Sequence, residues 1–201
     1  ILVPGDKSLS IRFVLFAAIA TGTSKAYNLL ISDDVISAIN TIKKLGVKVI
    51  LKKKYCKIFG KGIDGFKYKK NIIINAGNSG TLARLILGLL VNTPYPIKII
   101  GDKSLSRRDF NRITKPLSKF GAKFILNKNS GLPLKIFGSK NLIPIKYFEK
   151  KGSAQCKSSI IFAGMKTQGK TFIKAKKSRN HTELLAKYLK LPINIKNKKD
   201  F

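Results

Sequence analysis

Residues 76–91 read Ala-Gly-Asn-Ser-Gly-Thr-Leu-Ala-Arg-Leu-Ile-Leu-Gly-Leu-Leu-Val, so that a glycine and small polar residues lead into an apolar run. The same order recurs at residues 4–20 and 151–163, and the opening glycines at positions 5, 77 and 152 are therefore 72 and 75 residues apart. Small polar residues are favoured at helix N-termini, and a helix that is apolar on all sides is buried. The pattern predicts three buried helices, one in each copy of an internal repeat.

A second helix is predicted in each copy, at residues 32–46, 108–121 and 180–190. In the first of these, apolar residues from Val35 to Leu45 recur every three or four positions, which gives the helix one apolar face. The first buried helix is expected to end in a turn at residues 21–23. Strands are predicted between and after the helices, at residues 24–30, 47–51, 72–75, 97–100, 122–126 and 171–175.

These elements predict an α/β (α+β) fold of about three quasi-repeated units, with the apolar helices packed inside. The units take up approximately residues 1–70, 71–146 and 147–201 of a single domain, and the last unit is incomplete. The chain is expected to be a piece of a longer protein. Its only Met is Met165, and residues 191–196 read as the beginning of a strand that continues toward Phe201 without a turn.

The composition is that of a globular protein with a strongly basic balance. Hydrophobic residues make up 44% of the chain, and the formal net charge is +32. This charge attracts anions, either nucleic acid or small phosphorylated metabolites, although many lysines are expected to be solvated surface. No apolar run approaches the roughly 18 residues that span a bilayer. Two distant cysteines and a single His predict neither a disulfide framework nor a zinc site, and they favour a reducing compartment.

Basic residues stand in the openings of the predicted helices. Helix N-termini bind phosphate through their free N–H groups, so three such openings brought together would suit a polyanionic small molecule. For Arg84 and Lys157, an ion pair within the domain, or a side chain that only extends its charge to solvent, is an equally good interpretation. The basic residues in these openings are Lys7, Arg12, Arg84, Arg107, Arg108, Lys157 and Arg179.

Five segments, in order along the whole chain, resemble the motifs of the 5-enolpyruvylshikimate-3-phosphate synthase family. They are Pro4-Gly-Asp-Lys-Ser-Leu-Ser-Ile-Arg12, Asn75-Ala-Gly-Asn-Ser-Gly-Thr-Leu-Ala-Arg84, Gly101-Asp-Lys-Ser-Leu-Ser-Arg-Arg108, Gly152-Ser-Ala-Gln-Cys-Lys-Ser159 and Ser178-Arg-Asn-His-Thr-Glu183. The sister enzyme that uses UDP-N-acetylglucosamine has a Lys-Asn opening and a reactive Cys loop, neither of which is present. Two alternatives to this family remain: another enolpyruvyl transferase, such as the UDP-N-acetylglucosamine enzyme, or a non-catalytic basic nucleic-acid-binding module.

The resemblance implies one of two domains, each of three βαβαββ units, that close on phosphoenolpyruvate and shikimate 3-phosphate in aromatic amino-acid biosynthesis. The implied reaction transfers the enolpyruvyl group to the 5-hydroxyl of shikimate 3-phosphate and is inhibited by glyphosate. The second domain, with its acidic catalytic residues, is missing, so the chain alone is expected to be inactive. The resemblance implies a cytoplasmic monomer with no metal, organic cofactor, nucleic acid or membrane as partner.

The resemblance also assigns site residues by position. The catalytic residues would be Lys7 and Arg108. Shikimate 3-phosphate would be held by Lys7, Ser8, Arg12, Ser153, Ala154, Gln155, Ser178 and Arg179. Phosphoenolpyruvate would be held by Lys7, Asn78, Ser79, Gly80, Thr81, Arg108 and Gln155. Two departures lie beside the arginines, because Asp109 stands where the family usually has Pro and Asn180 where it usually has Asp.

Overall fold

The computed structural model describes residues 5–196 as three successive groups of helices and strands. The first group is α1 (Lys7–Ile19), β1 (Thr21–Tyr27), α2 (Asp33–Lys44), β2 (Lys48–Leu51) and β3 (Tyr55–Lys61). The second is β4 (Ile73–Asn75), α3 (Gly80–Leu89), β5 (Ile97–Ile100), α4 (Lys103–Ser106), α5 (Asn111–Ser118), β6 (Lys123–Ile125) and β7 (Leu134–Phe137). The third is β8 (Lys146–Glu149), α6 (Ala154–Gly164), β9 (Phe172–Ala175) and α7 (His181–Tyr188).

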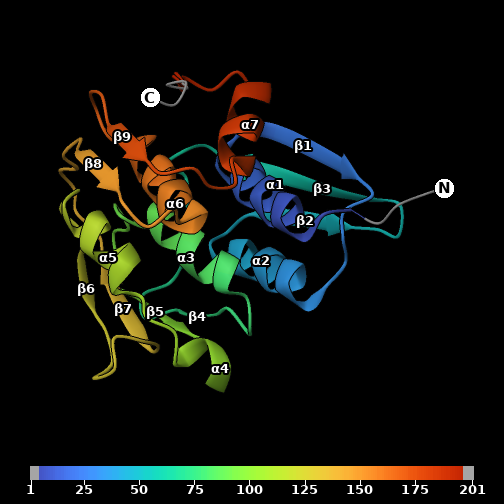
Figure 1. The fold of residues 1–201 in the computed structure, drawn as a ribbon. Coiled ribbons are helices and arrows are strands. Elements are labelled where there is room, and N and C mark those ends of the chain that lie inside the picture. The colour runs from blue at the N-terminus through green and yellow to red at the C-terminus, as the bar shows by residue number, and fades with distance from the viewer. Residues whose placement is uncertain (1–4, 197–201) are drawn as a thin grey trace.

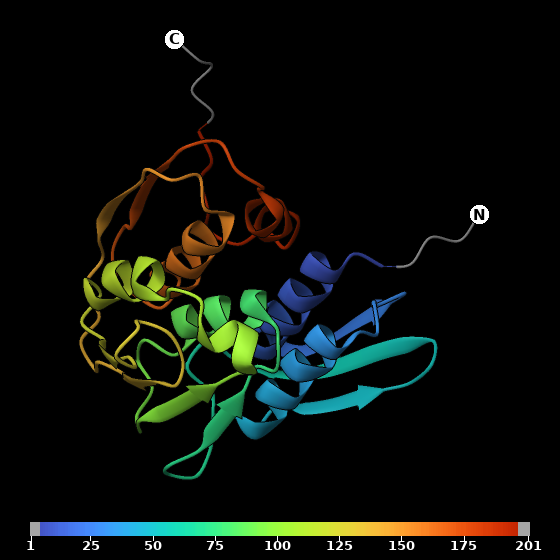
Figure 2. The same cartoon turned by 60° about the horizontal axis from the view of Figure 1, so that its bottom comes forward.

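Each group forms its own small sheet. The strand orders are β1-β3-β2, β4-β5-β7-β6 and β8-β9. The pairs β4–β5 and β8–β9 are parallel, whereas β3 and β7 pair antiparallel with both neighbours. Figures 1 and 2 show the three sheets on different sides of the molecule, with α1, α3 and α6 between them. The predicted α/β fold with its apolar helices inside is therefore confirmed.

The core is built around the three inner helices. Helix α3 lies between α1 and α6, and its residues from Leu82 to Leu89 are almost completely buried. A Cβ atom on Gly88 would lie 2.1 Å from the carbonyl oxygen of Ser159, so only glycine lets α3 and α6 approach this closely. Helices α1 and α6 also contact each other, because the rings of Phe16 in α1 and Phe162 in α6 have centroids 4.7 Å apart.

Several boundaries differ from the prediction. Residues 21–23 are not a turn but the start of β1, because they pair with the end of β3. The strand ends at Tyr27 rather than at residue 30, because Asn28 has a φ of 55° and turns the chain. The predicted helix at 108–121 is shorter, and α4 precedes it. Residues 191–196 form no strand, because they pair with no other strand among residues 5–196. Pro4 and Phe201 lie outside the described residues.

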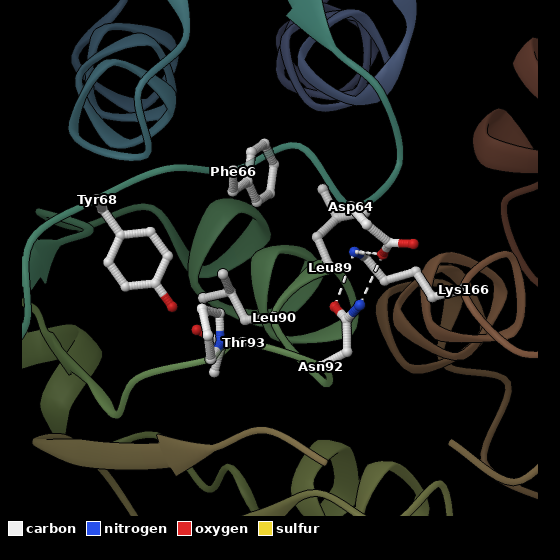
Figure 3. A pocket seen from close by; sticks show the side chains of 9 residues that line it. Asp64, Phe66, Tyr68, Leu89, Leu90, Asn92, Thr93 and Lys166 are labelled. Carbon is white, nitrogen blue, oxygen red and sulfur yellow. Dashed lines mark hydrogen bonds and ion pairs between the residues drawn. The ribbon is translucent and has the colours of Figure 1, made fainter. Parts of the chain in front are cut away.

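Lys166 joins the three groups at the C-terminal ends of α3 and α6 (Figure 3). Its Nζ atom donates to the carbonyl of Ile63, to Oδ1 of Asp64 at 3.0 Å and to Oδ1 of Asn92 at 2.8 Å. The side chain is only 2% exposed, and burial lowers its pKa, although Asp64 opposes that change. The cavity beside it measures about 30 Å³, which is room for a water molecule rather than for a metabolite.

Candidate functional site

The inner helices begin with side-chain caps, as the small polar residues predicted. Asp6 accepts from the amide of Leu9 at 2.7 Å in α1, Ser79 from that of Leu82 in α3, and Ser153 from that of Cys156 in α6. The first amides of each helix carry partial positive charge, which adds to the basic residues nearby.

The beginnings of α1, α2 and α3 meet around Asp34. The Nζ atom of Lys7 lies 2.9 Å from Oδ2 of Asp34, and Ser79 also hydrogen-bonds this carboxylate. Partial burial acts to raise the pKa of Asp34, but the hydrogen bonds from Ser79 and Lys7 and the charges of Lys7 and Arg108 outweigh it. The pKa therefore lies below its ordinary value of 3.8. The carboxylate of Asp34 thus holds Lys7, a predicted catalytic residue, near the N-terminus of α3.

Arg108 lies over the first turn of α3, although it comes from the segment between α4 and α5. A Cβ atom on Gly80 would be 2.9 Å from Nη1 of Arg108 and 3.5 Å from Nη1 of Arg84. The amide of Asn78, two residues before Gly80, donates to Oδ2 of Asp102. Arg108 therefore lies beside Gly80 of the predicted phosphoenolpyruvate loop at Asn78–Thr81.

A chain of hydrogen bonds joins α3 to α6. Nη1 of Arg84 donates to Oε1 of Gln155 at 2.6 Å, and Nε2 of Gln155 donates to Oγ1 of Thr81 at 3.1 Å. Arg84 is 5% exposed, and its pKa falls to about 10 because of burial first and the charges of Arg112 and Arg108 second. The N-termini of α3 and α6 are therefore in direct contact.

Arg12 is buried, with only 3% of its surface exposed. It donates to Oγ1 of Thr182 at 2.7 Å, to Oγ of Ser158 at 3.2 Å and to the carbonyl of Ser8 at 3.1 Å. Burial lowers its pKa, and Glu183 opposes the change. Through these hydrogen bonds Arg12 links α1 to α6 and α7.

The segment before α7 lies beside the start of α6. A Cβ atom on Gly152 would be 3.1 Å from the carbonyl oxygen of Lys177, which places Ser178 next to the loop that carries Ser153. The buried Oγ atom of Ser178 has no hydrogen-bond partner within residues 5–196. Arg179 is exposed, and its charge is close enough to lower the pKa of Arg12.

Three acidic residues that the sequence analysis does not single out contact predicted site residues. Asp34 lies in the first turn of α2 and pairs with Lys7. Asp102 binds Asn78, and Glu149 accepts from the amides of Lys151 and Ser153. The sequence offers one signal for them, because the chain has only 9 acidic residues and these three lie within or close to the predicted helix openings and motifs.

The two departures from the family pattern have different outcomes. Asp109 accepts from the amide of Asn111 at 2.8 Å and so fixes the turn that enters α5. Asn180 stands at the N-cap of α7, but its side chain makes no capping hydrogen bond.

Two further observations on residues 5–196 concern metal ligands and helix length. No group of three His, Cys, Asp or Glu side chains is placed to hold a metal ion in this part of the chain. None of its helices combines the length and apolar character needed to cross a membrane.

Comparison with known proteins agrees with these motifs. The sequence model of EPSP synthase (3-phosphoshikimate 1-carboxyvinyltransferase) matches residues 1–201. The 3-phosphoshikimate 1-carboxyvinyltransferase of Caldicellulosiruptor saccharolyticus is 41% identical over 189 residues, which are 93% of this chain and 43% of that protein. The protein of the same name from Streptococcus agalactiae serotype Ia is 40% identical over 200 residues, or 98% of this chain and 47% of its own length.

The fold also matches a solved structure. EPSP synthase from Acinetobacter baumannii superposes with a TM-score of 0.90 at 33% sequence identity, over 98% of this chain and 44% of the other. The chain therefore spans a little under half the length of the proteins that it matches. The match over all 201 residues, together with the shared fold and motifs, shows that the chain belongs to the EPSP synthase family.

Proposed function

We propose that this chain is the substrate-binding half of an enzyme that transfers the enolpyruvyl group of phosphoenolpyruvate to the 5-hydroxyl of shikimate 3-phosphate. The observation that carries the proposal is the meeting of the N-termini of α1, α3 and α6. Lys7 reaches the cap of α3 through Asp34, and Thr81 of α3 contacts Gln155 of α6. Helix N-termini and cations gathered at one place suit two phosphorylated anions.

The two substrates divide this region between them. Shikimate 3-phosphate lies against α1, α6 and the start of α7, and phosphoenolpyruvate against the first turn of α3 under Arg108. Lys7 and Gln155 stand between the two and reach both. The residues for shikimate 3-phosphate are Lys7, Ser8, Arg12, Ser153, Ala154, Gln155, Ser178 and Arg179, and those for phosphoenolpyruvate are Lys7, Asn78, Ser79, Gly80, Thr81, Arg108 and Gln155.

The reaction adds the 5-hydroxyl oxygen to C2 of phosphoenolpyruvate and then eliminates phosphate. Lys7 assists the proton transfer or stabilises the phosphate, and Arg108 pairs with the charge of phosphoenolpyruvate. Fixed N–H donors and cations stabilise charge that develops during reaction without having to reorganise. Holding both substrates on one rigid set of helices also removes the entropy cost of bringing them together.

The rest of the proposal concerns the parent protein. A second domain supplies the acidic catalytic residues, and the whole works as a monomer in the cytoplasm. The chain itself is one domain of three repeats, near residues 1–70, 71–146 and 147–201. The succession of three groups of helices and strands, each with its own sheet, supports this division.

Calorimetry on the 201-residue chain tests the substrate assignment. Shikimate 3-phosphate is expected to bind at a fixed salt concentration, and shikimate, which lacks the phosphate, is expected not to bind detectably. Phosphate release from both substrates is then assayed for the chain alone and for the chain mixed with the other half of the parent protein. Equal binding of shikimate, or no binding of either ligand, would contradict the proposal. Turnover by the chain alone would contradict the need for a second domain.

A further inference from the structure

Arg84 is a buried cation that forms no ion pair with any residue of the described part of the chain. Its residue surface is 5% exposed. Its buried Nε atom has no hydrogen-bond partner in that part of the chain. Burying an uncompensated charge is costly, so a buried arginine that serves only the fold would normally face a carboxylate.

The neighbours of Arg84 increase this cost. The charges of Arg112 and Arg108 both disfavour its cationic form, and the opposing charge of Asp109 has a smaller effect. The guanidinium also lies over the ring of Phe110, 5.5 Å from its centroid, which offers a surface for a cation but no counter-charge. The guanidinium group is thus held firmly in a position that the fold alone does not explain.

The single hydrogen bond from Arg84 to Gln155 has a definite chemical direction. A guanidinium can only donate, so the Gln155 atom that faces it at 2.6 Å must be the amide oxygen. The amide nitrogen then faces the N-terminus of α3, where one of its two N–H groups donates to Oγ1 of Thr81. No hydrogen bond within residues 5–196 uses its second N–H, which is therefore free to donate to a ligand. Without Arg84, either end of the amide could turn toward Thr81, because a hydroxyl both donates and accepts.

We propose that Arg84 is a positioning residue, which fixes the Gln155 amide so that its N–H group points to the bound anion. This inference rests on the proposed function for the identity of the anion, but the orientation of the amide is a property of the ligand-free chain. Arg84 was not among the predicted site residues, and its contacts now favour this role over an ion pair within the domain. Negative charge bound nearby would also offset the buried positive charge.

The first experiment measures the amide itself. The side-chain N–H₂ resonances of Gln155 are recorded by NMR in the ligand-free 201-residue chain and are assigned from their loss in Gln155→Ala. In the wild type, the two protons are expected to give separate signals, one of them shifted by its bond to Thr81. Arg84→Met keeps the apolar stem and removes every donor, so the amide is expected to rotate and the shift to be lost. Arg84→Lys keeps a donor at a different place, so its Gln155 signals are expected to lie between those of the wild type and those of Arg84→Met.

The second experiment measures binding through a double-mutant cycle. Arg84→Met is expected to weaken shikimate 3-phosphate binding about three- to tenfold, which is the effect of one neutral hydrogen bond. In the Gln155→Ala background the same substitution is expected to change affinity less than twofold, because Arg84 acts through Gln155. Leu87→Ala is the matched control, since it removes a buried side chain from the same helix and is expected to lower the melting temperature without moving the Gln155 signals.

Unchanged Gln155 signals in Arg84→Met would overturn the proposal, as would losses of affinity that add in the double variant. Movement of the Gln155 signals in Leu87→Ala would overturn it too, because general loosening of α3 would then explain the effect. If Arg84→Met does not fold, Arg84→Lys must show a partial shift of the same signals, and no shift counts against the role. If wild-type chain does not bind shikimate 3-phosphate, the proposed function fails, while the spectra still decide the role of Arg84.

Discussion

Replacing Gly80 by Ala should weaken anion binding without weakening the fold. Gly80 does not occupy the left-handed region of φ, so an alanine backbone fits there. Its new Cβ atom would lie 2.9 Å from Nη1 of Arg108, whereas ordinary contacts begin near 3.5 Å. Arg108 is exposed and flexible, so its guanidinium rather than α3 should move, by at least about 0.5 Å.

The size of the effect follows from what Arg108 contributes. A hydrogen bond to a charged group contributes about 1.5–3 kcal/mol, and a displaced but present guanidinium keeps part of it. A loss of about 1–2 kcal/mol corresponds to roughly five- to thirtyfold weaker binding. Stability should instead stay level or rise by up to about 0.5–1 kcal/mol, because alanine is the better helix former. Glyphosate, the longer ligand, is expected to lose more affinity than phosphoenolpyruvate does.

The assay is paired kinetics on the complete parent protein at one salt concentration, since screening alters anion affinities. The inhibition constant of glyphosate should rise by a larger factor than the KM of phosphoenolpyruvate, while thermal unfolding of Gly80→Ala matches the wild type. In an Arg108→Ala background, Gly80→Ala should cause little further loss of affinity for either ligand. Equal factors for both ligands, or no change for either, would refute the reasoning from close approach and leave Gly80 as an ordinary turn residue.

Three further predictions concern charged side chains. Arg179→Ala should weaken shikimate 3-phosphate binding about ten- to a hundredfold in calorimetry, as expected for one charged hydrogen bond, whereas exposed Lys187→Ala should leave it unchanged. Lys166→Met should lower the free energy of unfolding by about 1–3 kcal/mol in urea titrations, because it leaves the acceptors at Ile63, Asp64 and Asn92 without their donor. Asp34 has a pKa below 3.8 when folded, so it stabilises the chain above that pH and this stability is lost as the pH falls through the folded pKa. The free energy of unfolding of Asp34→Asn should therefore fall less than that of the wild type when the pH is lowered from 5 to about 2.

Each of these predictions has a contradicting result. Unchanged affinity in Arg179→Ala would show that the position was wrongly carried over from the family. A Lys166→Met variant as stable as exposed Lys170→Ala would mean that the buried contact contributes nothing. Parallel acid unfolding curves for wild type and Asp34→Asn would show that the carboxylate gains nothing from its partners on folding.

The inner helices could be predicted from sequence because their apolar character and their caps are local. The run from Leu82 to Leu89 has to be buried wherever it lies, and a serine at its start suits a cap in any fold. The short strands were harder to predict. β7 (Leu134–Phe137) and β8 (Lys146–Glu149) are each only four residues long and show no clear alternation of polar and apolar residues, so only their pairing with β5, β6 and β9 defines them.

The site could be predicted only in part, for a similar reason. Motifs gave the position of Arg108 and Gly80, and the close contact between them is what the structure adds. The partners of the cations could not be predicted, because Asp34 is 27 residues away from Lys7 in sequence and meets it only once two helices pack. Likewise, the choice between an ion pair and a binding role for Arg84 depended on which groups the fold placed around it.

The contacts of Lys166 make this side chain a natural reporter of assembly. Its Nζ atom donates to two acceptors that follow β3, on Ile63 and Asp64, and to one that follows α3, on Asn92. Because Lys166 itself follows α6, the three bonds exist together only when all three groups have docked. A buried ammonium with three fixed acceptors exchanges its protons slowly, whereas the many exposed lysines exchange theirs rapidly with water. In a ¹⁵N spectrum of lysine ammonium groups it should therefore stand out. Its signal would then distinguish a fully assembled chain from an intermediate in which two groups have folded and the third has not.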